Sequence, residues 1–295
     1  MNQTGNLSGH TLRLVLTRGG ESLTLGSENI SDFGVLDYSG IEASEYSISW
    51  QSNAQLDGGI VTGRKVEPRP IGITAEYRRA DPGDNMRRTL IRFFDPKQTG
   101  VLTATYGSVS RKIAYEVESF SIGQKNLFEP LRFSVSLICP SPYWQDVNSF
   151  TKNMAGIRAL TAFPFVIPAG SGRVLSYREM QQEAVVVNPG SKAAGLNVLF
   201  IAKRGAVTNP MLINLSTGQY IRLMLTMAEG DRLSVCTVPG SKRVEHNGVN
   251  AIQYIDRGSS FFGLAPGETV LKYDAGENKQ NLDVYPRFTP EYLGV

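Results

Sequence analysis

The chain has 295 residues, more than one domain usually contains, and 41% of them are hydrophobic against 19% charged. This composition is typical of a folded globular protein and excludes extensive disorder. The 30 Lys and Arg residues against 27 Asp and Glu give a formal net charge of +3, and the charges are interspersed. So small an excess does not support nucleic acid or a membrane as a partner. We therefore expect two domains, each with its own hydrophobic core.

The beginning of the chain shows no targeting segment. Met1–Gly5 has neither the basic stretch nor the apolar stretch of a signal peptide. No apolar run in the sequence approaches the length of a membrane span. We therefore expect a protein that is made in the cytoplasm without a signal peptide and does not enter a membrane.

The first half of the chain is dominated by alternation of apolar and polar residues. The clearest runs are 12–16, 46–50, 71–75 and 133–138. A period of two residues indicates strands that bury one face. The sequence thus predicts a mainly β fold for this half.

One segment of the first half has a helical period instead. After an Asp-Pro-Gly-Asp sequence, apolar residues follow one another at helical spacings of four, three and four: Met86 to Leu90, Leu90 to Phe93 and Leu90 to Phe94. This spacing places one apolar stripe on a short helix. We expect Asp81 or Asp84 to cap its start and Pro96 to end it.

The predicted helix and the residues before it carry the most basic patch of the chain: Arg78, Arg79, Arg87, Arg88 and Arg92. One interpretation is a solvated face that Asp81, Asp84 and Asp95 balance. A second is a contact between subunits, in which guanidinium groups pair with carboxylates of a neighbour. Nucleic-acid binding is a third and weaker interpretation.

The strand pattern stops at Pro140–Trp144, and the polar stretch that follows marks a domain boundary. We therefore predict domains at 1–145 and 146–295. The second half reads as short strands separated by turn sequences such as Pro239-Gly240 and Asn247-Gly248, and it contains no long helical pattern. Its expected strands are 165–167, 184–187, 196–202, 211–213, 220–227, 233–236, 251–255 and 269–273. Even spacing of short strands predicts a β-sandwich.

Residues suited to catalysis or metal binding are scarce. Only His10 and His246 are present, and no nucleophile elbow, zinc motif or phosphate-binding loop occurs. The two Pro-Gly-Ser-Lys stretches, 189–192 and 239–242, are better explained as hairpin turns. Glu229 and Asp231 fit a solvated turn better than the carboxylate pair of a wall-degrading enzyme. We expect no catalytic residue, cofactor or metal, and hence no enzyme.

The two cysteines and the aromatic residues also bear on function. Cys139 and Cys236 lie in separate strand-like runs, which favours buried free thiols over a disulfide. Sugar-binding sandwiches present an aromatic platform beside polar groups, but both tryptophans, Trp50 and Trp144, lie in the first half. A lectin-like module that binds host cell-wall glycan therefore stays an alternative without direct support.

The order of certain segments along both halves is distinctive. In the second half these segments are 209–218, 230–233, 247–250 and 259–267. In the first half they are Asp57-Gly58, the stretch 64–73, the Arg-rich helix ending at Asp95-Pro96, the strand 115–120 and the segment 139–144. In this succession both halves resemble the distal tail proteins of long-tailed, non-contractile phages. The resemblance is weakest over 146–195, and Cys236-Thr237 departs from the usual Asp-Thr of the family.

This resemblance implies a structural protein of the virion tail tip. Family members form homohexameric rings through their N-terminal domains, and rings can stack back to back in isolation. They carry galectin-like β-sandwiches as C-terminal domains and join the tail tube to the baseplate. The implied partners are the major tail tube protein, the tape-measure protein, the tail-associated lysin or fibre hub, and the receptor-binding protein.

A ring also suits a β-rich subunit, because strand edges of the first half can find hydrogen-bonding partners in copies of the same chain. The segments that we expect at this interface are the strand 46–50, the stretch 63–70 and the Arg-rich helix. The candidate interface residues are Trp50, Arg64, Arg69, Arg87, Arg88 and Arg92.

Overall fold

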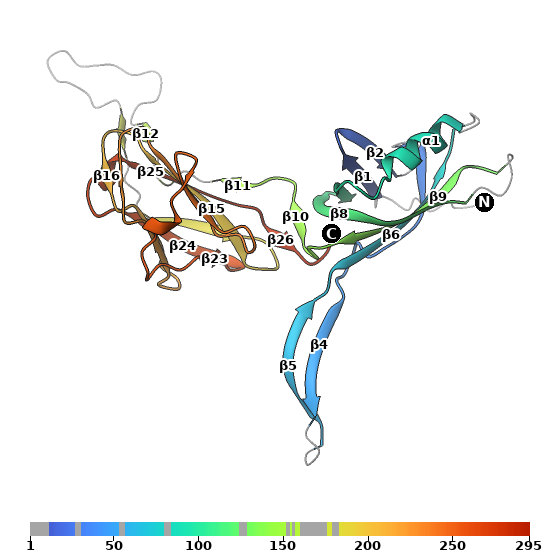
Figure 1. The fold of residues 1–295 in the computed structure, drawn as a ribbon, viewed down its shortest axis with the longest axis horizontal. Coiled ribbons are helices and arrows are strands. Elements are labelled where there is room, and N and C mark those ends of the chain that lie inside the picture. Colours follow the sequence, from blue (N-terminus) through green and yellow to red (C-terminus); the bar gives the residue numbers. More distant parts are fainter. Residues whose placement is uncertain are drawn as a thin grey trace, which may run out of the picture. The chain divides into compact units, whose positions relative to one another are not determined.

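The computed structural model describes residues 12–26, 31–52, 57–79, 84–123, 129–151, 154, 157–159, 176–178 and 183–295. The chain divides into two units (Figure 1). The first unit contains Met1–Val147 together with Glu291–Val295, and the second contains Asn148–Pro290. The last five residues thus return to the first unit, whereas the sequence analysis assigned them to the second domain.

The first unit is built on a nine-stranded antiparallel sheet. Its main path runs in the order β2-β1-β7-β8-β9-β6-β3, and β10 joins it by pairing with both β8 and β26. The strands are β1 (Leu12–Arg18), β2 (Glu21–Leu25), β3 (Phe33–Ser39), β6 (Arg69–Tyr77), β7 (Gly100–Tyr106), β8 (Val109–Ile122), β9 (Arg132–Cys139), β10 (Trp144–Asp146) and β26 (Glu291–Tyr292).

The two margins of this sheet meet each other. Gly26, directly after β2, forms a parallel bridge to Gly34 in β3, and its amide donates to the carbonyl oxygen of Phe33 at 2.9 Å. The sheet therefore curls around a single core. Apart from this bridge, β2 pairs only with β1 and β3 only with β6 among the described residues, so most of their outer edges lack a partner strand.

The predicted alternation builds this core. Leu14 and Leu16 of β1 are fully buried, and Ile71 and Ile73 of β6 are at most 2% exposed. The residues between them face outward, as period-two burial requires. Cys139 is a buried free thiol, as predicted, and burial raises its pKa to about 12.

Helix α1 (Asp84–Phe93) covers one face of this core, which confirms the predicted helix. Leu90, Phe93 and Phe94 are buried, and the Phe94 ring stacks on Phe120 with centroids 4.8 Å apart. The predicted cap Asp81 and the side chain of Asp84 lie outside the described residues.

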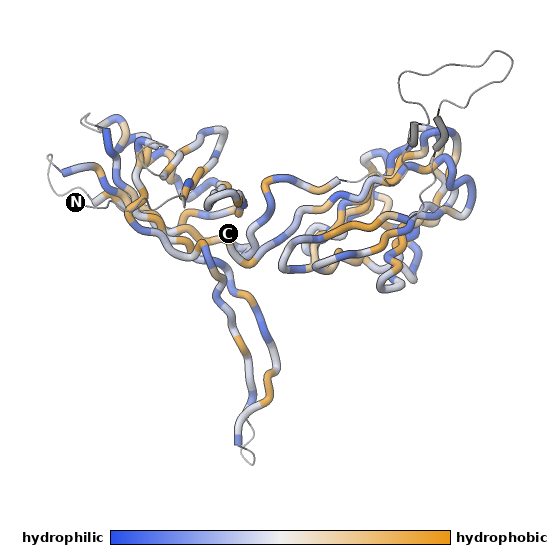
Figure 2. Tube along the Cα trace, turned by 180° about the vertical axis from the view of Figure 1, so that it is seen from behind, coloured by the Kyte–Doolittle hydropathy of each residue, from blue (hydrophilic) through white to orange (hydrophobic). Residues whose placement is uncertain are grey.

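Two strands of the first unit form a separate hairpin. Strands β4 (Tyr46–Ser52) and β5 (Gly59–Val66) pair with each other and, among the described residues, with no third strand. Figure 1 shows this hairpin projecting from the rest of the unit, and Figure 2 shows hydrophobic residues along its length. We call it the projecting hairpin.

The second unit is a β-sandwich, as predicted. One sheet contains β11 (Phe150–Thr151), β25 (Leu282–Phe288), β15 (Ala194–Ala202), β20 (Arg232–Cys236), β21 (Arg243–His246), β22 (Val249–Asn250) and β23 (Gly263–Leu264). The other contains β14 (Glu183–Asn188), β24 (Gly267–Asp274), β17 (Met211–Asn214) and β18 (Tyr220–Arg222). Val198 and Phe200 from the first sheet and Val186, Leu212 and Leu271 from the second share one buried cluster.

Short elements complete the second unit. They are the strand pairs β12 (Ile157–Ala159) with β13 (Ser176–Arg178) and β16 (Val207–Thr208) with β19 (Thr226–Met227), and the 3-10 helices η1 (Ile252–Tyr254) and η2 (Lys279–Asn281). The strand predicted at 165–167 lies outside the described residues. Cys236 is a buried free thiol, as predicted.

Three local predictions for the second unit are wrong. The stretch 220–227 is not one strand, since β18 pairs with β17 and β19 pairs with β16. The stretch 251–255 contains η1 at Ile252–Tyr254 rather than a strand, because the Asn250 side chain accepts the Ile252 N–H at 3.1 Å and starts a turn. The stretch 189–192 is not a hairpin turn, since it links β14 in one sheet to β15 in the other. The buried Asn188 side chain holds that link through the Lys192 and Leu264 carbonyl oxygens. The stretch 239–242 does connect the paired strands β20 and β21.

Candidate assembly surfaces and a groove

The projecting hairpin exposes an unusual amount of apolar surface. The exposed fractions are 61% for Tyr46, 58% for Ile48, 65% for Trp50, 74% for Ile60 and 44% for Val61. A lone two-stranded ribbon is marginally stable in water. Clustered exposed apolar side chains and unpaired strand edges mark surfaces that associate with other chains. This hairpin is therefore the strongest candidate for a contact with another protein chain.

Two of the predicted interface residues lie on the projecting hairpin. Trp50 stands opposite Val61, and Arg64 stands opposite Ile48 in the strand register. The ladder shifts between Ser49 and Trp50, which marks a β-bulge. The structure thus brings Trp50 and Arg64 onto one ribbon with its apolar side chains.

Three more predicted residues lie on α1. Arg87 and Arg88 are exposed, and no ion pair within the described residues involves either of them. Arg92 pairs with Glu21 at 2.8 Å, and both side chains are at least half exposed. Ile91, between Arg88 and Arg92 in the sequence, is 53% exposed. The outer face of α1 therefore combines free cationic groups with an apolar side chain. This combination fits both a solvated face and a contact between subunits.

The sixth predicted residue, Arg69, lies inside the first unit and is only 1% exposed. Its Nε donates to the Pro142 carbonyl oxygen at 3.0 Å, and its Nη1 donates to those of Gly40 and Ala43 at 2.6 and 2.8 Å. Its Nη2 donates to the Ser44 hydroxyl and to the Leu293 carbonyl oxygen. Arg69 is thus fully used within its own chain and offers no group to a neighbour, so we remove it from the candidate interface.

The Arg69 contacts show how the end of the chain completes the first unit. Tyr292 pairs with Trp144 in the ladder, and the Arg111 guanidinium lies 3.6 Å from the centroid of the Tyr292 ring. Arg111 also donates to the Gly294 carbonyl oxygen. A Cβ atom at Gly294 would lie 1.7 Å from the Glu42 carbonyl oxygen, so only glycine fits. Nothing in the sequence pattern pointed to this role of 291–295.

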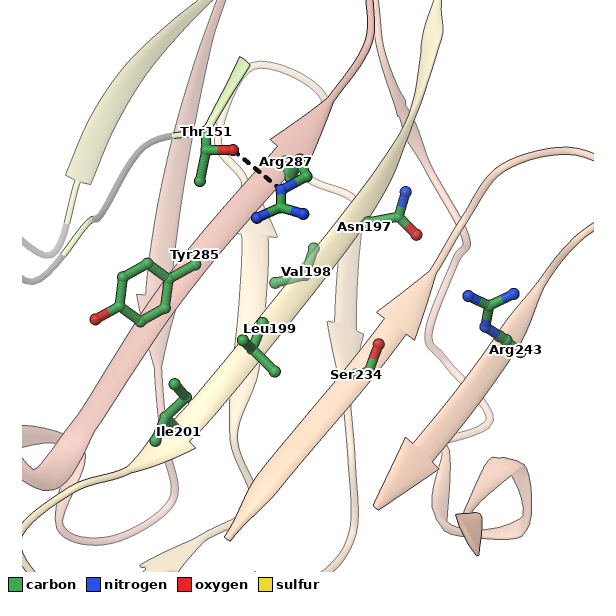
Figure 3. A pocket seen from close by; sticks show the side chains of 9 residues that line it. All are labelled: Thr151, Asn197, Val198, Leu199, Ile201, Ser234, Arg243, Tyr285 and Arg287. Atoms are coloured by element: carbon green, nitrogen blue, oxygen red, sulfur yellow. Dashed lines mark hydrogen bonds between the residues drawn. The ribbon is translucent and has the colours of Figure 1, made fainter. Parts of the chain in front are cut away.

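The second unit has a groove of about 460 Å³ across the outer face of the β11-β25-β15-β20-β21 sheet (Figure 3). Its lining residues are Thr151, Asn197, Val198, Leu199, Ile201, Ser234, Arg243, Tyr285 and Arg287. Arg287 is fixed by a 3.0 Å hydrogen bond to the Thr151 hydroxyl. The lining thus combines one aromatic ring and an aliphatic floor with two guanidinium groups, of which that of Arg243 also pairs with Glu245 at 3.5 Å. This combination suits a ligand with apolar and anionic parts.

Of the two carboxylates that the sequence raised as possible catalysts, Glu229 is exposed and Asp231 has a structural role. Asp231 accepts from Asn247 and from the Ala228 amide, both at 2.8 Å, and contacts His246 at 2.9 Å. The Asn247 and Ala228 hydrogen bonds hold its pKa below the usual value, opposite to the direction that a general acid needs. Within the described ranges, no group of three or more His, Cys, Asp or Glu side chains is arranged to hold a metal.

The described helices are also too short or too polar to cross a membrane. What the structure defines is a mainly β protein of two units, with one helix longer than a single turn in the described residues and a two-sheet sandwich.

Residues 179–292 match the family model described as siphovirus-type tail component, C-terminal domain. No curated protein sequence matches the chain. The crystal structure of the Dit protein (gp 19.1) of phage SPP1, described as a paradigm of the hub adsorption apparatus in phages that infect Gram-positive bacteria, is similar with a TM-score of 0.68. It has 14% sequence identity, and the match covers 95% of this chain and 99% of that one.

Two structures of the phage P2 baseplate in its activated conformation, with Ca and with Sr, are similar with TM-scores of 0.52. Each match has 8% identity and covers 96% of this chain and 99% of the other. The resemblance to distal tail proteins inferred from the sequence is therefore confirmed. So is the predicted fold class, a mainly β chain with a galectin-like sandwich.

Proposed function

We propose that this protein is a structural subunit at the distal end of a phage tail, where it joins the tail tube to the baseplate or tail tip. The support is the family match of the second unit and the fold shared with a hub protein and with baseplate structures. In this role the protein catalyses no reaction and needs no cofactor. Its place is the virion tail tip.

The observation that carries the proposal is the projecting hairpin. Its five large apolar side chains are 44–74% exposed, and its edges have no partner strand in the described residues. An identical copy can supply both the missing strand contacts and the apolar cover. A contact in which one copy's hairpin covers a different surface of the next copy is heterologous, and such contacts form a ring when the rotation between copies closes. The number of copies that we propose, six, follows from the family resemblance.

The proposed interface contains Trp50 and Arg64 on the hairpin and Arg87, Arg88 and Arg92 on α1. Since both faces belong to the first unit, that unit is the proposed ring-forming domain, with the sandwich as a separate domain. The further partners that we propose are the tail tube protein, the tape-measure protein, the tail-associated lysin or fibre hub, and the receptor-binding protein.

The test is the mass and symmetry of the purified full chain by light scattering and negative-stain microscopy. We expect six-fold rings, single or stacked back to back. A Trp50→Ser, Ile60→Ser variant should shift the mass toward the monomer while circular dichroism stays unchanged. Val249→Ser is the matched control, because Val249 is 70% exposed on β22 in the second unit. A stable monomer at micromolar concentration, even beside tube protein, would refute the proposal.

Host-glycan binding is a second candidate, and the groove of Figure 3 favours it. Tyr285 offers a ring for stacking, and Arg243 and Arg287 offer donors for the carboxylates or phosphates of an acidic polysaccharide. Calorimetric titration of the full chain with host cell-wall polysaccharide tests it. Heat that saturates for the wild type and disappears in Tyr285→Ala and in Arg287→Ala would support adhesion as a function, and no saturable heat would reject it.

A further inference from the structure

The first unit contains a second buried arginine, and its surroundings differ from those of Arg69. Arg18 at the end of β1 is 5% exposed. Its Nη1 donates to the Phe93 carbonyl oxygen at 2.6 Å, at the end of α1. Its Nε and Nη2 have no hydrogen-bond partner, and no carboxylate of the described residues pairs with it. Arg69 uses all three nitrogen atoms on five acceptors.

A buried guanidinium without a counter-charge is unfavourable. Arginine keeps its proton in proteins, so the charge cannot be removed by titration. Leaving a charge buried and unpaired is strongly destabilising, because the group has lost its water without gaining a partner. The nearby Tyr115 hydroxyl also lacks a partner, but burial raises its pKa to about 12 against the opposing effect of Arg18. Tyr115 is therefore neutral at physiological pH and cannot balance Arg18.

A pocket of about 170 Å³ lies beside Arg18, between the β1–β2 turn and the end of α1. Its lining residues are Arg18, Gly19, Glu21, Arg92, Phe93 and Gln98. Arg92 is held at this pocket by its 2.8 Å ion pair with Glu21. The lining thus carries two guanidinium groups against one carboxylate, and that carboxylate already has a partner.

We propose that this pocket binds a carboxylate group. The two nitrogen atoms of Arg18 without partners, Nε and Nη2, form one edge of the guanidinium, and this edge is the fork that binds both oxygens of a carboxylate. Other protein atoms cover Nε and Nη2 of Arg18, so a side chain at the rim of the pocket must move before a carboxylate can reach them. Gln98 is exposed and makes no hydrogen bond among the described residues, so it is free to move.

The carboxylate can come from an acidic side chain of a second copy or from a free molecule. The first source rests on the proposed ring, since the pocket adjoins the exposed face of α1 that holds Arg87, Arg88 and Ile91. The pocket itself does not depend on the ring.

The test compares the thermal stability of the full chain in sodium acetate and in sodium chloride at equal ionic strength. We expect the melting temperature to rise with acetate and to saturate, by about 2–4 °C for a contact of 1 kcal/mol. Arg18→Lys keeps the charge but loses the fork, so its response should no longer saturate. Arg132→Gln is the control, because the Arg132–Glu76 pair lies on the surface away from the pocket.

A second variant keeps the proposal testable if Arg18→Lys does not fold. Gln98→Glu places a carboxylate on the rim, so it should melt higher than the wild type in chloride and lose the acetate response. Equal, non-saturating acetate responses in the wild type, Arg18→Lys, Gln98→Glu and Arg132→Gln would overturn the proposal.

Light scattering of the same variants separates the two sources. A ring whose dissociation constant rises about tenfold or more in Arg18→Lys assigns the carboxylate to a neighbouring copy. A ring unaffected by that variant, together with a saturable acetate response, assigns it to a free molecule. An acetate response in a chain that stays monomeric keeps the pocket and rejects the proposed ring. A ring that forms without any acetate response and ignores Arg18→Lys rejects the pocket.

Discussion

Replacing Arg69 by Met is the sharpest test of how the first unit is held together. The variant keeps most of the side-chain volume but removes five hydrogen bonds, to Gly40, Ala43, Ser44, Pro142 and Leu293. These acceptors come from three separate segments of the chain, and the Arg69 side chain is almost completely buried. Removing one member of such a charged network typically costs about 3–5 kcal/mol, because the acceptors stay buried without donors.

For a unit of this size, that loss corresponds to a fall in melting temperature of about 6–20 °C. Urea unfolding followed by tryptophan fluorescence measures it best in a Trp50→Phe background. The chain has two tryptophans, so this background leaves Trp144 as the single one. Trp144 is fully buried and pairs with Tyr292 in the ladder. Arg132→Met is the control, since its surface pair with Glu76 should contribute less than about 1 kcal/mol. An Arg69→Met variant within about 1 kcal/mol of the wild type would refute the assignment of Arg69 as the central contact of the unit.

Two other predictions concern single contacts. Gly294→Ala should destabilise the first unit by about 1–3 kcal/mol, measured by the same urea assay, because the added methyl group meets the Glu42 carbonyl oxygen. A stability equal to the wild type would mean that 291–295 does not pack as described. Asn247→Gly removes the contact that most lowers the pKa of Asp231, while glycine still fits the positive φ of 51°. A lowered carboxylate pKa gives stability that is present above the unfolded value of about 3.9 and is lost as the pH falls through the folded value. Asn247 also accepts the Arg232 N–H at 2.9 Å, and the variant loses this contact at every pH. The difference in melting temperature between wild type and variant should therefore be larger at pH 6 than near pH 2, and a gap independent of pH would contradict this reasoning.

Periodicity predicted those elements whose burial is set by one sheet or one helix face. Leu14 and Leu16 alternate with exposed residues, and Leu90 with Phe93 forms one stripe, so local spacing and tertiary burial agree. The alternation at Tyr46–Trp50 also predicted a strand, but it did not reveal that both faces of this strand are exposed. A pattern reports that one face is apolar, and it cannot report whether that face is covered by the same chain.

Contacts between distant segments were beyond the reach of the sequence. Arg69 looked like a surface cation because arginine is rarely buried, and only the fold brings Gly40, Pro142 and Leu293 around it. The apolar run Ala251–Ile255 predicted a strand, whereas the Asn250 side chain turns the backbone into η1. In both cases a hydrogen bond chosen by the three-dimensional arrangement outweighs the propensity of the local sequence.

The return of 291–295 determines how the two units must be separated in an experiment. A chain cut after Val147 keeps the first-unit residues 1–147 but loses β26, so Trp144 loses its ladder partner and Arg69 loses the Leu293 acceptor. Such a fragment should be unstable whatever the role of the sandwich, and its failure to assemble would be uninformative. An internal replacement avoids this problem because Gln145 lies directly opposite Glu291 in an antiparallel pair.

Replacing 148–290 by Asn-Gly leaves Asp146, Val147, Asn and Gly as a short hairpin connection between β10 and β26, a length common in proteins. We expect this variant to fold with the core of the first unit intact and to form rings of the same symmetry as the full chain, because the hairpin and α1 are retained. Circular dichroism and light scattering check the two points separately. A folded variant that stays monomeric would place the ring contacts in the sandwich, and would contradict the assignment of assembly to the first unit.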